Sequence, residues 1–332
     1  MVKHMEKINR KILITGGAGF IGYHLSLSLL QQGYSVVAID NLNNYYDVEL
    51  KKTRLNELGR YSNFYFEKLD LANAVEINKL FERECPEIVV NLAAQAGVRY
   101  SIENPEAYIQ SNIVGFFNIL ECCRHYPVRH LLFASSSSVY GAIKKVPYAT
   151  EDKTDQPVSL YAATKKSNEL LAYAYCKLYG IRATGLRFFT VYGPFGRPDM
   201  AYFSFTRKIL AGETIQIFNN GDMYRDFTYI DDITKGIEAM LEHLPICDEN
   251  GVYYKVYNIG NNHPEKLTDF VEILESCIGK RAKIEYMPMQ PGDVFQTFAD
   301  VSELTKDFGF KPDTQLKDGL EKFIDWYISY YQ

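Results

Sequence analysis

The sequence predicts an α/β fold, a doubly wound parallel sheet with a smaller C-terminal α/β substrate domain. Most segments between the expected strands have the apolar periodicity of helices, and strands that alternate with helices indicate a doubly wound parallel sheet. Short runs of apolar and β-branched residues are typical of buried strands. The runs are KILITG, YSVVAID, NFYFEKLD, EIVVNLA, HLLFASSSS and IRATGLRFF.

The pattern loosens after about residue 190, where turn-rich stretches such as YGPFGRPDM and NNGDMYRDF separate further helical segments. A chain of 332 residues also exceeds the usual size of one domain. We therefore expect a nucleotide-binding domain over residues 10–190 and a substrate-binding domain over residues 191–332, with some interleaving of segments. Helices of the second domain are expected near residues 202–211, 232–243, 267–278 and 319–330.

The composition favours a small-molecule ligand over nucleic acid or a membrane. The net charge is −5, so the chain has no basic field for nucleic acid or anionic lipid. No apolar run reaches about 18 residues, and the start MVKHMEKINRK lacks the apolar stretch of a signal peptide, so we expect a cytoplasmic protein. Six scattered cysteines, without a CxxC pair or a histidine cluster, predict reduced structural thiols and no metal.

The first strand runs into TGGAGFIGYHLSLSLLQQG, a glycine-rich turn followed by a helical pattern. Glycines at positions 16, 17, 19 and 22 allow a tight turn and a close approach to a pyrophosphate, and the helix N-terminus offers unpaired N–H groups to the phosphates. The next strand ends in Asp40, 18 residues after Gly22, where a carboxylate can bind the adenosine ribose. Because a carboxylate repels a 2′-phosphate, this Rossmann-type pattern predicts NAD over NADP. Asp70 ends the third strand and is a candidate for an adenine contact or a helix cap.

A second motif lies in VSLYAATKKSNELLAYAYCKLYG, where Tyr161 and Lys165 are four residues apart. On a helix the two side chains share one face, at about 5–6 Å between their Cβ atoms. A phenol with a pKa near 10 is a poor base at neutral pH, but an adjacent ammonium and the positive nicotinamide ring both stabilise its phenolate. The pair, following a dinucleotide fingerprint, therefore predicts acid–base catalysis next to the cofactor.

The motifs TGGAGFIG, SSSSVYG and YAATK together resemble the extended short-chain dehydrogenase/reductase superfamily, the NAD-dependent nucleotide-sugar epimerases and dehydratases. The resemblance covers the chain from about residue 10 to the QPGDV stretch near residue 290. Within that superfamily, DNLNNYYDVELKKTRL, AAQAGVRYS and GRPDMAYFSFTRKI are most similar to the UDP-glucuronate 4-epimerases. The resemblance implies Ser136, Tyr161 and Lys165 as the catalytic set, with Ser136 bonded to the sugar hydroxyl and Lys165 also holding the nicotinamide ribose. It further implies an NAD site formed by Gly16, Gly19, Phe20, Ile21, Gly22, Asp40, Asn41, Asn44, Asp70, Leu71, Ala93, Tyr161 and Lys165.

The serine run departs from part of the superfamily. Where this chain has Ser137 and Ser138, the sugar dehydratases hold an Asp and a Glu, and the related UDP-glucuronate decarboxylases carry a Glu at the second position. Serine cannot supply their acid or base, so elimination is disfavoured. We interpret Ser136 to Ser138 and Thr190 as hydrogen-bond donors that hold a sugar carboxylate; the alternative is that the serines only satisfy backbone groups at a strand end.

The resemblance also implies residues that bind the rest of the substrate. Arg197 resembles a substrate-binding arginine and Arg225 the one that clamps the UDP diphosphate, although a solvated surface role stays open for each. Arg99 lies near the site by alignment, with a structural salt bridge as the alternative. The remaining candidates are Gln216 and Phe218 at uracil, or in a plain strand, and Asp293 at the ribose, where the match is incomplete because some members carry Arg in place of Gln290.

These residues imply reversible 4-epimerisation of a UDP-sugar through a transient 4-keto sugar, with UDP-glucuronate and UDP-galacturonate as the expected pair. The alternatives are a 4-epimerase for UDP-glucose and UDP-galactose or for UDP-N-acetylhexosamines, a dehydratase or decarboxylase, and a non-catalytic nucleotide sensor. AYIQSNIVGFFNILECCRHY and the Tyr161 helix are apolar beyond one face. They are therefore expected either to form the four-helix bundle of a homodimer, as in the family, or to be buried against the sheet.

Overall fold

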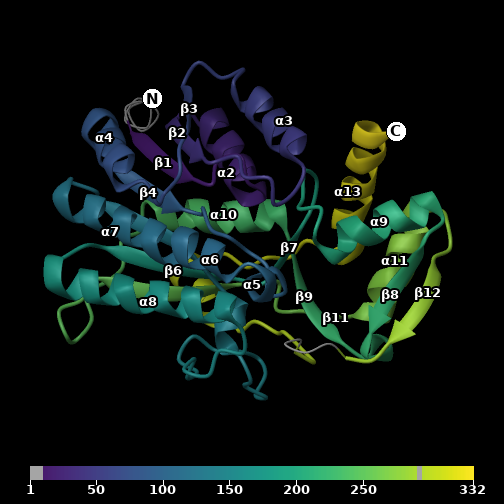
Figure 1. The fold of residues 1–332 in the computed structure, drawn as a ribbon. Coiled ribbons are helices and arrows are strands. Elements are labelled where there is room, and N and C mark those ends of the chain that lie inside the picture. The colour runs from purple at the N-terminus through teal and green to yellow at the C-terminus, as the bar shows by residue number, and fades with distance from the viewer. Residues whose placement is uncertain (1–9, 290–293) are drawn as a thin grey trace.

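The computed structural model describes residues 10–289 and 294–332, and a seven-stranded sheet forms its core (Figure 1). The strand order is β10-β6-β5-β4-β1-β2-β3, and all neighbouring strands are parallel. The six strands expected from the sequence are confirmed, and β10 is added at one edge. The strands are β1 (Lys11–Thr15), β2 (Ser35–Asp40), β3 (Phe64–Lys68), β4 (Ile88–Asn91), β5 (His130–Ser136), β6 (Ala183–Phe188) and β10 (Tyr254–Ile259).

Helices cover both faces of this sheet. Ile12 and Ile14 of β1 pack against α2 and α10, whereas Leu13 between them packs on the side of α4, α7 and α8. This alternation follows from the period of two in a strand, and it explains why the strands are apolar on both faces. Figure 1 shows α4, α7 and α8 side by side. The helices are α2 (Phe20–Gln31), α3 (Val48–Leu58), α4 (Ala74–Glu84), α7 (Gly115–His125), α8 (Leu160–Tyr179) and α10 (Ile230–Leu241), with the short segments α5 (Tyr100–Glu103), α6 (Pro105–Tyr108), the π-helix η1 (Ile109–Val114) and the 3-10 turn η2 (Ser137–Tyr140).

The strand order reverses at β1, because the chain builds β2 and β3 on one side of it and then places β4 on the other. Ligands of doubly wound sheets bind at such a switch point, outside the carboxyl ends of the strands. At the carboxyl ends of β1 and β4, Thr15 Oγ1 donates a hydrogen bond of 2.8 Å to Asn91 Oδ1. The topology therefore places a crevice directly above the glycine-rich turn.

The C-terminal part adds two small sheets, β11-β9-β7 and β12-β8. The four helices expected after residue 190 are all present within about three residues of their expected ends. Because β10 and α10 come from this part but belong to the main sheet and its helical layer, the segments interleave; the boundary at residue 190 stays a prediction. The remaining elements are β7 (Thr190–Tyr192), α9 (Ala201–Ala211), β8 (Thr214–Phe218), η3 (Asn219–Gly221), β9 (Tyr224–Tyr229), β11 (Pro264–Lys266), α11 (Leu267–Ile278), β12 (Lys283–Met287), α12 (Ser302–Phe308) and α13 (Leu316–Tyr331).

One apolar core joins the sheet to the C-terminal helices. It extends from Ile12 of β1 through Phe227 of β9 to Phe323 of α13, and all three side chains are buried. The walls on the two sides of the crevice are therefore held together by continuous packing. In the part of the chain that the structure describes, no helix combines the length and apolarity needed to cross a bilayer.

Candidate active site

Two cavities open at the carboxyl ends of the strands and share a wall. The first, called here the cofactor cavity, lies over the switch point and is lined by the glycine-rich turn, the ends of β2 and β4, and Lys165. The second, the substrate cavity, extends from η2 to α9, β8 and β9, and its volume of about 710 Å³ is in the range of ligand pockets. The residues that line both are Tyr45, Ala96, Ser136, Tyr161, Phe188, Phe189, Arg197 and Met200.

The glycine-rich turn forms a cradle of bare backbone. Gly16 has φ +70°, and a Cβ atom there would lie 2.8 Å from the backbone nitrogen of Ala93. A Cβ atom on Gly22 would lie 2.2 Å from the carbonyl oxygen of Gly16. Gly19 precedes α2 and supplies no side-chain cap, which leaves N–H groups of the first helical turn available to a ligand. A cradle of this kind fits a pyrophosphate, so the turn can hold the phosphates of the expected dinucleotide.

The end of β2 places Asp40 in the cofactor cavity, where its Oδ1 accepts a 2.8 Å hydrogen bond from the backbone N–H of Leu42. Lys51 of α3 was not anticipated from the sequence: its Nζ lies 3.9 Å from the Asp40 carboxylate and donates to the carbonyl oxygen of Asn43 at 2.9 Å. Burial lowers the pKa of Lys51, and the Asp40 carboxylate opposes that shift. A cation therefore lies beside the carboxylate that is expected to exclude a 2′-phosphate.

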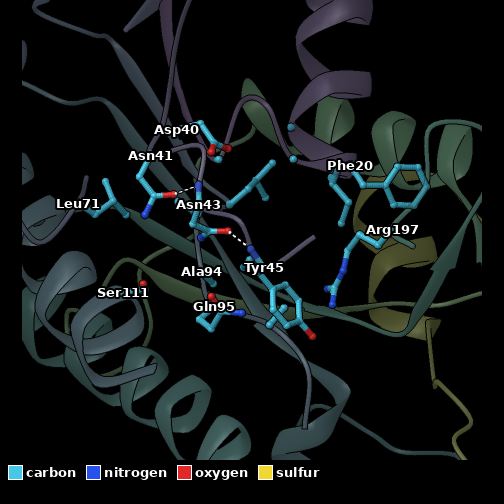
Figure 2. A pocket seen from close by; sticks show the side chains of 18 of the residues that line it. Phe20, Asp40, Asn41, Asn43, Tyr45, Leu71, Ala94, Gln95, Ser111 and Arg197 are labelled. Atoms are coloured by element: carbon cyan, nitrogen blue, oxygen red, sulfur yellow. Dashed lines mark hydrogen bonds between the residues drawn. The ribbon is translucent and has the colours of Figure 1, made fainter. Parts of the chain in front are cut away.

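The stretch after Asp40 folds as two successive side-chain turns (Figure 2). Asn41 Oδ1 accepts from the N–H of Asn43 at 3.0 Å, and Asn43 Oδ1 accepts from the N–H of Tyr45 at 3.3 Å. These turns bring Asn43 into the cavity wall and leave Asn44, an expected cofactor residue, exposed and outside both cavities. The other expected cofactor residues all line the cofactor cavity: Gly16, Gly19, Phe20, Ile21, Gly22, Asp40, Asn41, Asp70, Leu71, Ala93, Tyr161 and Lys165.

Tyr161 lies in the first turn of α8, at the junction of the two cavities. The helix begins after Ser159, whose hydroxyl accepts a 3.1 Å bond from the N–H of Ala162. Burial raises the pKa of Tyr161 above its ordinary value, while a hydrogen bond with the Ser136 hydroxyl and the positive charge of Arg197 act in the opposite direction. The phenol therefore depends on nearby positive charge and hydrogen-bond donors to ionise near neutral pH.

Lys165 follows one helical turn later and is buried. Its Nζ donates to the carbonyl oxygen of Ala134 in β5 at 2.9 Å, and burial lowers its pKa to about 8. The sequence argument expected this ammonium to stabilise the Tyr161 phenolate. In the folded chain the charge that lowers the tyrosine pKa is that of Arg197, so the geometry assigns part of the expected electrostatic role to a residue distant in sequence.

Asn112 is buried behind the cofactor cavity, and the sequence analysis did not assign it a role at the site. It lies in the π-helix η1, where its Oδ1 accepts from the N–H of Gln95 at 2.8 Å and its Nδ2 donates to Thr164 Oγ1 at 3.0 Å. The amide thereby connects the strand end after β4, which lines the cofactor cavity, to the residue preceding Lys165. π-Helical turns often occur at functional sites, but the sequence carries no period that predicts one.

Some hydroxyl groups of the serine run form hydrogen bonds within the chain, and others do not. Ser135 is buried and donates to Glu169 Oε1 at 2.6 Å, and this carboxylate also pairs with Arg187 Nε at 2.8 Å. Ser136 Oγ accepts from the N–H of Ser138 at 3.2 Å and so caps η2. Ser135 therefore faces the core, whereas Ser136 lies beside Tyr161.

The hydroxyl groups of Ser137, Ser138 and Thr190 differ from these. All three residues line the substrate cavity. Within residues 10–289 and 294–332, their hydroxyl groups make no hydrogen bond to another part of the chain. Three polar groups on two walls of one cavity are thus available to a ligand.

The far wall of the substrate cavity contains the expected arginines. Arg197 donates from Nε to Asp199 Oδ1 at 3.1 Å, and the pKa of this guanidinium lies above its usual range because of the neighbouring Asp199 carboxylate, despite burial. Figure 2 shows Tyr45 and Arg197 pointing into the same region. Arg225 lines the cavity from β9 and donates to the carbonyl oxygens of Tyr224 and Phe295 at 2.8 Å and 3.2 Å.

The expected uracil residues lie in the same cavity, at the end of β8. Gln216 donates to Glu285 Oε2 at 2.9 Å, and the guanidinium of Arg99 lies 5.2 Å from the centre of the Phe218 ring. Arg99 therefore contacts the site directly. Asp293 lies outside the described residues. In the described part of the chain, no group of three or more His, Cys, Asp or Glu side chains could hold a metal ion.

A doubly wound sheet, a bare glycine cradle at its switch point and a Tyr-x-x-x-Lys pair at the junction with a second cavity define a dinucleotide-dependent enzyme of the short-chain dehydrogenase/reductase type. Residues 12–260 match the model of the NAD dependent epimerase/dehydratase family. The chain belongs to this family.

Individual relatives agree with the assignment. The chain is 48% identical to UDP-glucuronate 4-epimerase 2 of Arabidopsis thaliana, over 97% of this chain and 76% of that protein. It matches the crystal structure of UDP-glucuronic acid 4-epimerase from Bacillus cereus, in complex with UDP-glucuronic acid and NAD, with a TM-score of 0.89 and 36% identity, over 97% of this chain and 100% of the other. It also matches UDP-glucose 4-epimerase of Thermotoga maritima, crystallised with UDP-glucose, with a TM-score of 0.87 and 30% identity, over 97% and 100% of the two chains.

Proposed function

We propose that this chain interconverts UDP-glucuronate and UDP-galacturonate by epimerisation at C4, with NAD as its resident cofactor. The Arabidopsis and Bacillus cereus relatives carry this activity in their names, and the latter was crystallised with NAD and UDP-glucuronic acid. The observation that carries the proposal is the set of unengaged hydroxyls on Ser137, Ser138 and Thr190, which face the same cavity as Tyr161. They offer donors to a carboxylate without supplying an acid or a base.

The acid–base work is assigned to Tyr161 with Ser136. Tyr161 takes the proton from the sugar 4-hydroxyl, and Ser136 donates a hydrogen bond to the same oxygen. Gly16, Asp40 and Lys165, which line the cofactor cavity, would hold NAD, and the bound NAD would supply a reversible acceptor for the C4 hydride, which leaves one face of the sugar and returns to the other. Between the two transfers the sugar turns about its diphosphate linkage, for which we assign Arg225 as the fixed clamp. Since the cycle is redox-neutral, we expect the protein to purify with NAD already bound.

The direct test incubates the purified protein with UDP-glucuronate and, separately, with UDP-glucose, and assigns the C4 stereochemistry by proton NMR. We expect inversion of UDP-glucuronate at a kcat/KM at least about tenfold above that of UDP-glucose, because a charge-assisted hydrogen bond contributes about 1.5–3 kcal/mol. Equal or faster turnover of UDP-glucose would overturn the assignment of the carboxylated substrate while leaving the epimerase chemistry intact.

A 4-epimerase for UDP-glucose and UDP-galactose, or for UDP-N-acetylhexosamines, is the second candidate. Its support is the Thermotoga maritima UDP-glucose 4-epimerase, whose structure is matched nearly as well as that of the glucuronate enzyme. Ser137 and Ser138 argue against the dehydratase and decarboxylase alternatives, because these enzymes need acidic side chains there.

We also propose that the protein is a homodimer through α7 and α8. Phe117 on α7 and Leu170, Tyr173 and Leu178 on α8 are large apolar side chains that are exposed in the single chain. Pairing of these helices with a second copy as a four-helix bundle would cover them, and sedimentation of the protein at micromolar concentration tests it. The cytoplasmic location expected from the sequence stays a prediction.

A further inference from the structure

Arg54 is a fully buried arginine of α3 that the catalytic scheme does not use. Its Nη1 donates to the carbonyl oxygen of Ala18 at 2.7 Å and to the hydroxyl of Tyr46 at 2.8 Å. Its Nη2 donates to the carbonyl oxygens of Phe195 and Gly196 at 2.6 Å and 3.2 Å. The two terminal nitrogens of one guanidinium therefore bind two different loops.

The two loops belong to the two ligand sites. Ala18 is part of the glycine-rich turn of the cofactor cavity, whereas Phe195 and Gly196 immediately precede Arg197, which lines both cavities. Their positions in sequence are far apart, since Arg54 and Phe195 are separated by 141 residues. Arg54 is thus a direct connection between the cofactor turn and the residue before the substrate arginine.

The loop before Arg197 does not follow an easy backbone path. Phe195 has φ +54°, in the left-handed region that residues with a side chain rarely adopt. A second hydrogen bond, from His24 on α2 to the carbonyl oxygen of Pro194 at 2.8 Å, holds the same loop from the cofactor side. Burial lowers the pKa of His24 to about 4, so the imidazole is neutral at physiological pH and donates from Nε2. The conformation that presents Arg197 is therefore imposed by donors on α2 and α3.

Arg54 is not explained by an ion pair. In the described part of the chain no carboxylate lies within 4.0 Å of it, and its Nε is buried without a hydrogen-bond partner. Burying a cation on neutral acceptors is costly, so the position would be expected to hold a less polar side chain unless the two-loop contact were needed.

We propose that Arg54 is a positioning residue that fixes the Arg197 loop against the glycine-rich turn. The position of Arg197 relative to the substrate therefore depends on the structure of the cofactor site. The inference deepens the proposed function and rests on its assignment of Arg197 to the UDP-sugar. Only arginine suits this task, because a planar guanidinium donates from two separated nitrogens, whereas the single ammonium of lysine reaches one loop at a time.

The test compares Arg54→Lys with the parent and with Arg60→Lys, a matched control just past the end of α3 whose side chain is exposed and pairs only with Glu57 among the described residues. We expect Arg54→Lys to raise the KM for UDP-glucuronate about tenfold with a smaller change in kcat, and Arg60→Lys to change neither by more than about twofold. The amount of NAD released on denaturation, measured per chain, gives a readout independent of turnover, and Arg54→Lys should retain NAD within about twofold of the parent. Because Arg54→Met leaves several carbonyl groups without donors and can unfold the chain, the lysine variant carries the test.

A double-mutant cycle with Arg197→Lys separates positioning from general destabilisation. If Arg54 acts through Arg197, Arg54→Lys should change KM by less than about twofold in the Arg197→Lys background. The proposal would be overturned if the fold-changes in KM of the two single variants multiply in the double variant. It would also be overturned if Arg54→Lys has the KM of the parent. Failure of the parent to epimerise UDP-glucuronate would instead contradict the proposed function, and the same cycle would then be measured with the UDP-sugar that it does epimerise.

Discussion

Replacing the unengaged hydroxyls of the substrate cavity should convert an epimerase into a leaky decarboxylating enzyme. Oxidation of UDP-glucuronate at C4 places a ketone one carbon from the carbon that bears the carboxylate. The resulting β-keto acid loses CO₂ when the C5–C6 bond aligns with the π system of the carbonyl group. An epimerase must therefore hold that bond near the carbonyl plane, and Ser137, Ser138 and Thr190 are the groups in position to do so.

The size of the expected change in KM follows from the hydrogen bonds that the three hydroxyl groups can give to the substrate. None of the three hydroxyls bonds to another described residue, so each can give its full hydrogen bond to the ligand. A charge-assisted hydrogen bond contributes about 1.5–3 kcal/mol, and every 1.4 kcal/mol is about a factor of ten. Each single change to alanine should therefore raise the KM for UDP-glucuronate by about 10- to 100-fold, and should raise the fraction of turnovers that end in CO₂.

The assay follows the products of decarboxylation and of epimerisation in the same reaction mixture. Loss of CO₂ leaves a UDP-4-keto-pentose and a cofactor that stays reduced, visible as growing absorbance near 340 nm, while NMR counts completed epimerisations. Ser167→Ala is the matched control, because this serine lies on α8 outside both cavities and donates to the carbonyl oxygen of Ala163 at 2.9 Å. The control should neither raise KM nor release CO₂.

The reasoning is refuted if all three alanine variants epimerise more slowly yet release no more CO₂ or reduced cofactor than the parent. The hydroxyl groups would then have no part in holding the carboxylate, and in the serine run only that of Ser136 would serve the backbone at the end of β5. The physical case for UDP-glucuronate over neutral hexoses would lose its main support, although the Tyr161 chemistry would be unaffected.

Three further predictions follow from single residues. Tyr161→Phe should lower kcat by about 10²- to 10⁴-fold while the Kd for UDP, measured by calorimetry, changes little; near-normal turnover would contradict its role. Asp40→Asn should bring the Kd for NADP close to that for NAD, because Lys51 Nζ lies 3.9 Å from the Asp40 carboxylate; an unchanged preference in fluorescence titrations would argue against this pair as the selector. Burial raises the pKa of Asp226 to about 6, although hydrogen bonds from the backbone N–H groups of Ala299, Asn261 and Asn262 oppose this shift. The stability that the protonated Asp226 carboxyl contributes is therefore complete below pH 3.8 and is lost as the pH rises through about 6. The free energy of unfolding of the parent relative to Asp226→Asn should thus fall by about 1 kcal/mol between pH 5 and 7 in urea titrations, and a constant difference would count against that titration.

The sequence predicted those features that depend on local spacing. The strands of the main sheet follow from runs of apolar residues, and the shared face of Tyr161 and Lys165 follows from a spacing of four on a helix. The position of β10 did not follow, because an edge strand joined from the C-terminal part depends on packing between distant segments. Asn43 lines the cofactor cavity where the sequence analysis expected Asn44. The difference depends on two consecutive side-chain turns, whose direction the sequence NLNN does not specify.

Contacts between distant segments account for the remaining differences. Asn112 bonds to Gln95 and Thr164 from a π-helix, and Lys51 approaches Asp40 from α3. Lys51 lies within DNLNNYYDVELKKTRL and Asn112 within AYIQSNIVGFFNILECCRHY, but neither stretch marks these two residues for a role at the site. In sequence they are an asparagine and a lysine in ordinary helical patterns. Only the fold places Lys51 in the wall of the cofactor cavity and bonds the buried Asn112 to Gln95 of that wall.

The surroundings of Tyr161, the proposed acid–base group, show why such contacts would matter to function. Burial alone would keep Tyr161 protonated, and the groups of the chain that oppose burial are a hydroxyl on β5 and a guanidinium on the loop after β7. That loop is fixed in turn by donors from α2 and α3, next to the glycine-rich turn. The pKa of the Tyr161 phenol is thus linked, through Arg197, to the packing of the cofactor site. A change that displaces the loop should therefore shift the acidic limb of kcat to higher pH, even where it touches neither Tyr161 nor the substrate.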